Sequence, residues 1–187
     1  MTQGQYTVVH NRPLARQVYE LRLAGDTGAL VCPGQFVNVK TGNGYLRRPL
    51  SVAAWDREGL TLVFKVVGEG TAWLAACGEG QTLDLLCGLG TGFDLSLSGE
   101  RPLLIGGGVG LPPLYQLGVN LVRGGKKPRL IMGFANAVDV FYQQEFEELM
   151  PVTLLTQDGS AGRQGLVTDA GLLEGDSYIY ACGPIPM

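Results

Sequence analysis

A run of glycines between an apolar segment and two prolines is the part of the sequence best suited to binding a ligand. Residues 103–117 read LLIGGGVGLPPLYQL. The apolar residues predict a buried strand, and the segment after the prolines predicts a helix. Glycines let a ligand approach the backbone, and the first turn of a helix offers unpaired N–H groups to an anion. The pattern indicates a phosphate site at a strand end, with a tight turn that binds nothing as the alternative.

A second group of residues suited to phosphate lies in the N-terminal half. Arg48 and Ser51 fall within the segment RRPLS, and Gly70 and Thr71 open a predicted short helix. An arginine presents a planar fork that matches a phosphate, and a serine hydroxyl can bond with a ring nitrogen. Taken singly, Arg48 could be a surface arginine and the Gly-Thr pair an ordinary helix cap. Their order and spacing together indicate a second diphosphate site.

The cysteines and the histidine do not have the spacing of a metal site. The chain has four cysteines, none in a C-x-x-C pair, and one histidine, His10. Zinc and iron–sulfur sites need clustered ligands of these types. We therefore expect reduced, mostly buried thiols and no metal ligand.

Composition excludes several classes of partner. The net charge is −3, and no basic cluster occurs beyond Lys126-Lys127, which argues against nucleic acid. No apolar run reaches the roughly 20 residues that cross a membrane, and the N-terminus lacks the apolar core of a signal peptide. With 45% hydrophobic residues among 187, the chain can bury a sizeable core. We expect a cytoplasmic protein that contacts neither membrane nor nucleic acid.

The chain divides into two halves with different patterns. Residues 1–98 contain short strand-like runs with turn residues about every ten positions, which favours an antiparallel barrel or sandwich. A short helix is predicted within residues 70–81. From residue 99 on, strands alternate with helices predicted at 111–125, 141–150 and 165–173, as in a doubly wound parallel sheet. Ligands bind such sheets at the carboxyl ends of the strands, where the glycine run lies.

Read together, the motifs resemble the electron-transfer subunit of class 1B dihydroorotate dehydrogenase, a flavoprotein family in the ferredoxin-NADP reductase superfamily. The similarity extends over essentially the whole chain. It rests on eight segments that occur in the family's order: NRPLARQVYELRL, PGQFVNV, RRPLSV, LTLVFKVVGEGTAWL, GLGTGFDL, IGGGVGLPPLYQL, TQDGSAGRQGLVTD and YACGPIPM. RPLS is similar to the R-P-x-S flavin motif, and GGGVGLPP with CGP is similar to the family's pyridine-nucleotide half.

The resemblance implies an antiparallel six-stranded FAD-binding β-barrel over residues 1–98. Arg48 would face the FAD phosphates, Ser51 would lie near the flavin N5, and Gly70 with Thr71 would hold the diphosphate. The other residues expected along the isoalloxazine are Pro49, Leu50, Val63, Phe64 and Lys65.

The resemblance also implies a doubly wound, Rossmann-like NAD-binding α/β domain over residues 99–187, incomplete at its C-terminus. Its NAD(H) site would contain Gly107, Gly108 and Gly110, with Cys182, Gly183 and Pro184 near the nicotinamide. Asp158 would lie near the ribose, together with Gly159 and Ser160. Arg163 is close enough in sequence to keep open whether the nucleotide is NAD or NADP.

The implied activity is electron transfer between NAD(H) and a partner through FAD. The expected partner is an FMN-containing catalytic subunit that oxidises dihydroorotate to orotate for pyrimidine biosynthesis. Two alternatives stay open: a related subunit of a sulfhydrogenase or transhydrogenase-type complex, and a flavin-binding module that has lost turnover.

The family pattern continues beyond the CGP motif through a helix and a cysteine-rich segment that binds a [2Fe-2S] cluster. Here the sequence ends at Met187, three residues after Pro184, without those cysteines. A fragment of a longer protein, a truncated gene and a relative without a cluster are the explanations, and the abrupt end favours a fragment.

Overall fold

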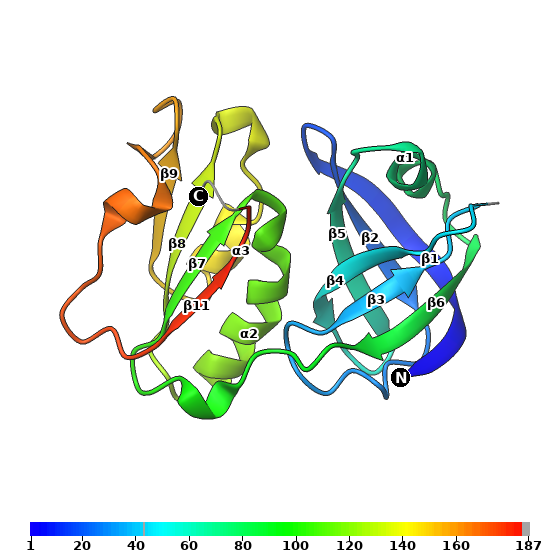
Figure 1. Cartoon of the computed structure of the whole chain (residues 1–187), viewed down its shortest axis with the longest axis horizontal. Helices are drawn as coiled ribbons and strands as arrows, with labels where there is room; N and C mark the ends of the chain where they lie inside the picture. The colour runs from blue at the N-terminus through cyan, green and yellow to red at the C-terminus, as the bar shows by residue number, and fades with distance from the viewer. Residues whose placement is uncertain (43, 185–187) are drawn as a thin grey trace. The chain divides into compact units, whose positions relative to one another are not determined.

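The computed structural model describes residues 1–42 and 44–184. The last three residues of the YACGPIPM motif lie outside the described residues. The chain forms two compact units, Met1–Gly92 and Phe93–Met187, the second described as far as Pro184. Each unit has its own sheet, as Figure 1 shows.

The first unit is a closed barrel of six strands. In barrel order β1, β2, β5, β4, β3 and β6, every neighbouring pair is antiparallel, and β6 closes onto β1. The strands are β1 (Thr2–Ala15), β2 (Val18–Ala24), β3 (Phe36–Val39), β4 (Arg48–Trp55), β5 (Gly59–Lys65) and β6 (Thr82–Leu89). The prediction of an antiparallel six-stranded barrel is confirmed.

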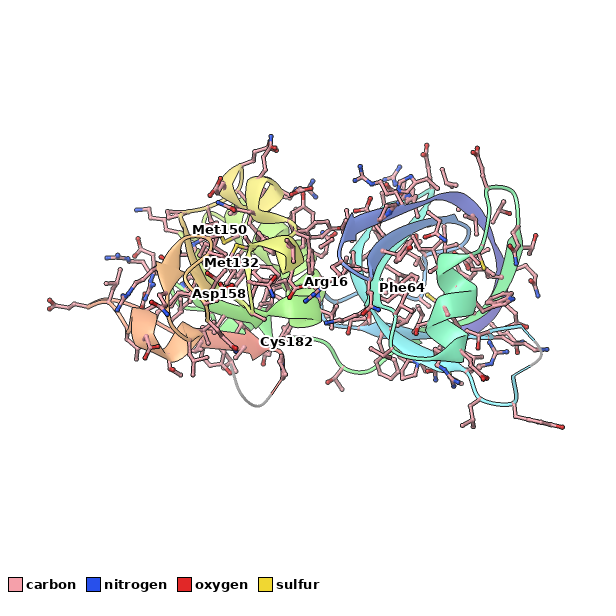
Figure 2. The ribbon with its side chains drawn as sticks, turned by 90° about the horizontal axis from the view of Figure 1, so that it is seen from above. Arg16, Phe64, Met132, Met150, Asp158 and Cys182 are labelled. Atoms are coloured by element: carbon pink, nitrogen blue, oxygen red, sulfur yellow. The ribbon has the colours of Figure 1, made fainter. Side chains whose placement is uncertain are left out.

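The barrel core comes from alternate residues of these strands. Leu21, Leu23, Leu60 and Leu62 are fully buried and lie on the inner side of β2 and β5, as expected when successive side chains point to opposite faces. Figure 2 shows Phe64 inside the same barrel. The core fixes which side of each strand faces outward.

One short helix, α1 (Glu69–Ala75), follows β5. Asn11 of β1 anchors its C-terminal end, because the Asn11 amide donates hydrogen bonds to the carbonyls of Leu74 (2.8 Å) and Cys77 (2.9 Å). Carbonyls at the end of a helix lack partners within it, so this side chain satisfies them. The anchor holds α1 against the barrel.

The second unit is a five-stranded parallel sheet. The strands lie in the order β10, β9, β8, β7, β11, and all four pairings are parallel. The strands are β7 (Leu103–Gly107), β8 (Arg129–Phe134), β9 (Val152–Thr156), β10 (Arg163–Gln164) and β11 (Ile179–Cys182). The parallel doubly wound sheet predicted from the alternation is confirmed.

Helices connect the strands of this sheet. α2 (Pro112–Arg123) has proline in its first turn and packs Leu114, Leu117 and Leu121 inward, as predicted. α3 (Gln143–Glu147) lies within the predicted helix at 141–150. The helix predicted at 165–173 is only the 3-10 turn Val167–Ala170, because Gly171 adopts a left-handed conformation (φ 70°) and ends it.

The strand order reverses at β7, since β8 pairs on one side of it and β11 on the other. In open α/β sheets, the crevice at such a switch point, beyond the carboxyl ends of the strands, is where ligands bind. The glycine run of residues 106–110 lies at that end of β7. No helix among the described residues is long and apolar enough to span a membrane.

Candidate functional site

Arg48 and Gly70, 22 positions apart in sequence, come together at one end of the barrel. A Cβ built on Gly70 would stand 2.6 Å from the Arg48 Nε and 3.2 Å from its Cζ. Any larger residue at position 70 would therefore displace the guanidinium. The glycine in the first turn of α1 makes room for the arginine, and both then face the same space with donors suited to a phosphate.

Thr71 shapes the loop that leads into α1. Its hydroxyl accepts hydrogen bonds from the N–H groups of Val67 (2.9 Å) and Gly68 (3.2 Å) and donates one to the Gly68 carbonyl (3.0 Å). The Thr71 side chain is 7% exposed. Its hydroxyl is therefore committed to the loop, and what Thr71 can offer a diphosphate is its main-chain N–H.

The two neighbouring arginines of the RRPLS segment have different roles. Arg47 forms an ion pair with Asp84 (2.7 Å) and donates to the carbonyls of Asn38 and Asp84, so it ties β3, β4 and β6 together. Arg48 has only one hydrogen bond to a described residue, to the Leu46 carbonyl (3.2 Å). The guanidinium of Arg48 is the one with donors left for a ligand.

Pro49 and Ser51 lie on the outer side of β4. Leu50 packs against the barrel core and Val52 is part of it, so the side chains that alternate with them point to the opposite side. Pro49 is exposed and Ser51 is half-buried. Of these expected isoalloxazine contacts, Pro49 and Ser51 can face a flavin with their side chains, and Leu50 only with its backbone.

The same alternation divides the expected contacts on β5. Phe64 is 2% exposed and stacks on Tyr19 within the barrel, with ring centroids 6.1 Å apart. Val63 and Lys65 therefore point outward. Lys65 is exposed, whereas Val63 is buried at 4% exposure. A flavin along β5 would meet the outer side chains and the backbone of Phe64.

In the second unit, the structure brings Gly108 and Gly110 next to the CGP segment. A Cβ built on Gly110 would collide with the Cys182 carbonyl and stand 2.5 Å from the Gly183 Cα. Gly108 is left-handed (φ 50°), and a Cβ there would meet no atom of the described residues within 4 Å. The first glycine thus leaves open space above the backbone, and the second allows two loops to touch.

Strand pairing explains why these loops meet. Cys182 is the register partner of Gly106 at the carboxyl ends of β11 and β7, and Gly107 pairs with Gly133 of β8. Gly183 and Pro184 follow directly. The predicted NAD(H) residues that follow β7 and those at the end of β11 therefore lie together at the carboxyl ends of the strands.

Asp158 lies at the carboxyl end of β9 and is held by Ser160. The Asp158 carboxylate accepts hydrogen bonds from the Ser160 hydroxyl (2.6 Å) and N–H (2.9 Å), which lower the pKa of Asp158 below its ordinary value. The Ser160 hydroxyl also accepts the N–H of Ala137, from the loop after β8 (2.7 Å). The carboxylate is therefore ionised at neutral pH and fixed at the sheet edge, while the side chain stays exposed.

The thiols do not form a metal site. Cys77 and Cys87 lie in the barrel core, and burial raises the pKa of Cys77 and of Cys182 above their ordinary value. Among the residues that the structure describes, no group of three or more His, Cys, Asp or Glu side chains could hold a metal ion. The described residues thus do not fit a [2Fe-2S] cluster, and the Cys182 thiol is protonated rather than nucleophilic.

One residue of the barrel site was missed from the sequence. Thr41, in the loop between β3 and β4, is 4% exposed, and its hydroxyl oxygen lies 3.1 Å from the position of a Cβ on Gly70. The loop sequence TGNG predicts only a turn. Nothing in it distinguishes a threonine that faces α1 from one that faces solvent.

Comparisons with known proteins identify relatives of the whole chain. No protein-family model matches the chain. It is 42% identical over 197 aligned residues to the "Dihydroorotate dehydrogenase B (NAD(+)), electron transfer subunit" of Geobacillus sp. (strain WCH70), covering 100% of this chain and 77% of that protein. The protein of the same name from Shouchella clausii (strain KSM-K16) is 42% identical over 195 residues, covering 99% and 75%.

The fold is similar to that of solved flavoenzymes. One is the NADH-dependent reduced ferredoxin-NADP oxidoreductase described for flavin-based electron bifurcation, with a TM-score of 0.85 and 28% identity over 96% of this chain and 67% of that one. The confirmed barrel and parallel sheet, the convergence of the expected motifs within each unit, and the identity to relatives over the full chain lead to one assignment. The chain belongs to the family of dihydroorotate dehydrogenase B (NAD(+)) electron transfer subunits.

Proposed function

We propose that this chain binds FAD on the barrel and NAD(H) on the parallel sheet, and passes electrons between NAD(H) and a catalytic subunit that converts dihydroorotate to orotate. The observation that carries the proposal is the placement of the Arg48 guanidinium against Gly70 at the start of α1. Both positions belong to the expected diphosphate site. The fold joins them, although neither sequence segment specifies the other.

FAD fits the barrel residues on two counts. The Arg48 fork and the N–H groups of the first turn of α1 supply donors for a diphosphate. The outer side of β4, with Pro49 and Ser51, supplies a flat surface and a hydroxyl for the ring system. When bound, FAD supplies two-electron exchange with nicotinamide and one-electron exchange with another centre.

NAD(H) fits the carboxyl edge of the parallel sheet. Gly108 leaves the backbone open to a pyrophosphate, and the nearby carbonyl of Cys182 and the backbone of Gly183 limit where the nicotinamide can lie. Asp158 can accept hydrogen bonds from ribose hydroxyls. Its negative charge disfavours a 2′-phosphate at the same place, so NAD(H) is the preferred nucleotide over NADP(H).

The protein residues in this proposal bind and orient, and none transfers a proton. Arg48 and Gly70 hold the phosphates, β4 and β5 hold the ring, and the glycines after β7 hold the nucleotide. Such positioning is what a cofactor enzyme contributes when the cofactor does the chemistry. Catalytic residues in the strict sense are therefore not assigned.

The partner is proposed from the relatives' name. An electron transfer subunit implies a second, catalytic subunit, and we propose an FMN-containing dihydroorotate dehydrogenase subunit in a hetero-oligomer. We place the complex in the cytoplasm, where thiols such as those of Cys77 and Cys87 stay reduced. A [2Fe-2S] cluster is not assigned to the described residues, and no electron path is drawn through one.

The test is the cofactor content of the purified chain. We expect visible flavin absorbance and FAD, rather than FMN, released by heat. If the protein is isolated without cofactor, incubation with FAD should restore the spectrum. A colourless protein that does not take up FAD would contradict the proposal and favour a scaffold that has lost its cofactor.

A further inference from the structure

Thr41 faces the phosphate end of the proposed FAD site, and its hydroxyl forms no hydrogen bond with a described residue. It follows β3 and is 4% exposed, which is low for a threonine in a loop. No described residue forms a hydrogen bond with its hydroxyl. The Oγ1 atom itself is not among the fully buried unpaired atoms of the described residues, so a ligand at this end of the barrel can reach it and form a hydrogen bond.

The hydroxyl points at the same place as Arg48. A Cβ on Gly70 would stand 3.1 Å from the Thr41 Oγ1 and 2.6 Å from the Arg48 Nε. Three separate segments, the loop after β3, the start of β4 and the first turn of α1, thus converge on one point. The glycine leaves that point unoccupied by the described residues.

Contacts of described residues on both sides of Thr41 support its position. The Thr41 carbonyl accepts the N–H of Gly44 (3.0 Å). Gly42 adopts a left-handed conformation (φ 48°), and a Cβ there would stand 3.2 Å from the Trp73 Nε1 of α1. Close packing of Gly42 on α1 sets the distance between Thr41 and the helix.

We propose that Thr41 is a further FAD-binding residue, whose hydroxyl donates a hydrogen bond to the phosphate held by Arg48. This rests on the proposed function, because it assumes that FAD occupies the barrel site. A phosphate oxygen is the acceptor that an unpaired hydroxyl beside a guanidinium would meet there. The bound phosphate then accepts a hydrogen bond that no described residue accepts from Thr41.

The experiment measures FAD binding to the apo protein by quenching of flavin fluorescence. Thr41→Val keeps the shape and removes the hydroxyl, and we expect it to raise the Kd for FAD about tenfold. Thr41→Ser keeps the hydroxyl and should bind within about twofold of the unmodified chain. Riboflavin, which has no phosphate, should bind both variants as it binds the unmodified chain.

Thr27→Val is the matched control. Thr27 is also a buried threonine of the barrel, at 8% exposure. Its hydroxyl donates a hydrogen bond to the Asp56 carbonyl (2.6 Å). Asp56 follows the last residue of β4, whereas Arg48 is the first residue of that strand. This variant should lower the thermal midpoint of the apo protein without changing the Kd for FAD. If Thr41→Val does not fold, Thr41→Ala tests the same hydroxyl without a buried apolar branch.

The outcomes separate the two claims. An unchanged Kd for FAD in folded Thr41→Val or Thr41→Ala would overturn the role of Thr41 and leave the FAD site standing. Equal weakening of FAD and riboflavin would also overturn it, because the effect would then come from the ring and not from a phosphate. No FAD binding by the unmodified chain would overturn both the proposed function and this inference.

Discussion

Gly110 lies directly against the backbone of Cys182, although the two residues stand 72 positions apart in the chain. A Cβ at position 110 would collide with the Cys182 carbonyl. The contact joins the glycine loop after β7 to the CGP segment at the end of β11. The proposed nucleotide site thus combines residues from the first and the last strand of the second unit.

Gly110→Ala should therefore damage this site. The added methyl must push the two loops apart, and overpacking of this kind costs about 1–3 kcal/mol. We expect a lower thermal midpoint and weaker NADH binding, measured by calorimetry and by titration. Gly125→Ala is the control, since Gly125 is left-handed (φ 76°) but a Cβ there meets nothing within 4 Å. Equal loss of NADH affinity in both variants would contradict the assigned contact.

The neighbouring arginines of β4 and its preceding loop give a matched pair of variants. Arg48→Ala should weaken FAD binding by about 1.5–3 kcal/mol, the range for a hydrogen bond to a charged group. Arg47→Ala should instead lower the stability of the barrel, because it breaks the ion pair with Asp84 and two bonds to carbonyls. FAD affinity and urea unfolding, measured on both variants, separate the roles. Unchanged flavin retention in Arg48→Ala would remove the basis for the phosphate site.

Asp158 should control the choice between NADH and NADPH. Asp158→Asn keeps a group that can accept the Ser160 hydrogen bonds and removes the charge that opposes a 2′-phosphate. We expect the ratio of NADPH to NADH affinity to rise several-fold. Asp94→Asn is closely matched, because Asp94 accepts the same two bonds from Ser96 at 2.9 and 2.6 Å. If the ratio of NADPH to NADH affinity rises equally in Asp158→Asn and Asp94→Asn, the effect comes from the net charge of the protein and not from the position of Asp158.

The ion pair of Asp176 with Arg129 should make the second unit sensitive to acid. Both side chains are largely buried (5% and 15% exposed), and the Arg129 guanidinium lowers the pKa of Asp176. A carboxyl whose pKa is lowered by folding stabilises the protein above its ordinary pKa. That contribution is lost as the pH falls through the lower value of the folded state. The free energy of unfolding should therefore drop between neutral and acidic pH.

Asp176→Asn tests this pair directly. Removing one partner of a buried ion pair costs about 3–5 kcal/mol of stability. The free energy of unfolding of Asp176→Asn should also depend less on pH in the acidic range, because the titrating carboxyl is gone. Glu100→Gln, which breaks the exposed pair with Lys127 (74% and 75% exposed), should change stability by about 0–1 kcal/mol. If the free energy of unfolding falls equally with pH in Asp176→Asn and in the unmodified chain, the pair of Asp176 with Arg129 is not the cause of the acid sensitivity.

Much of the fold could be predicted from the sequence because the strands carry clear patterns. The alternation of strands and helices after residue 99 predicts a parallel sheet, and the prolines before Leu114 mark the start of α2. β10 has only two residues, Arg163 and Gln164, and both are exposed, so no hydrophobic pattern marks it. It forms because β9 offers a free edge for pairing.

The candidate site could be predicted less completely, for a physical reason. Motifs identify which segments bind, but the side of a strand that faces the ligand depends on how the barrel closes. Phe64 and Leu50 fall within the expected flavin segments, yet their side chains face the core. Thr41 lies outside every expected motif, and the neighbouring Gly42 packs against Trp73 of α1.

The central claim is that NAD(H) and FAD exchange electrons on this chain, and an anaerobic titration with NADH tests it most directly. The FAD-loaded chain is mixed with increasing NADH while the visible flavin absorbance is recorded. We predict that the flavin band bleaches with NADH, and less readily with NADPH. A flavin band that persists at saturating NADH, in a chain that has retained its FAD, would contradict the account.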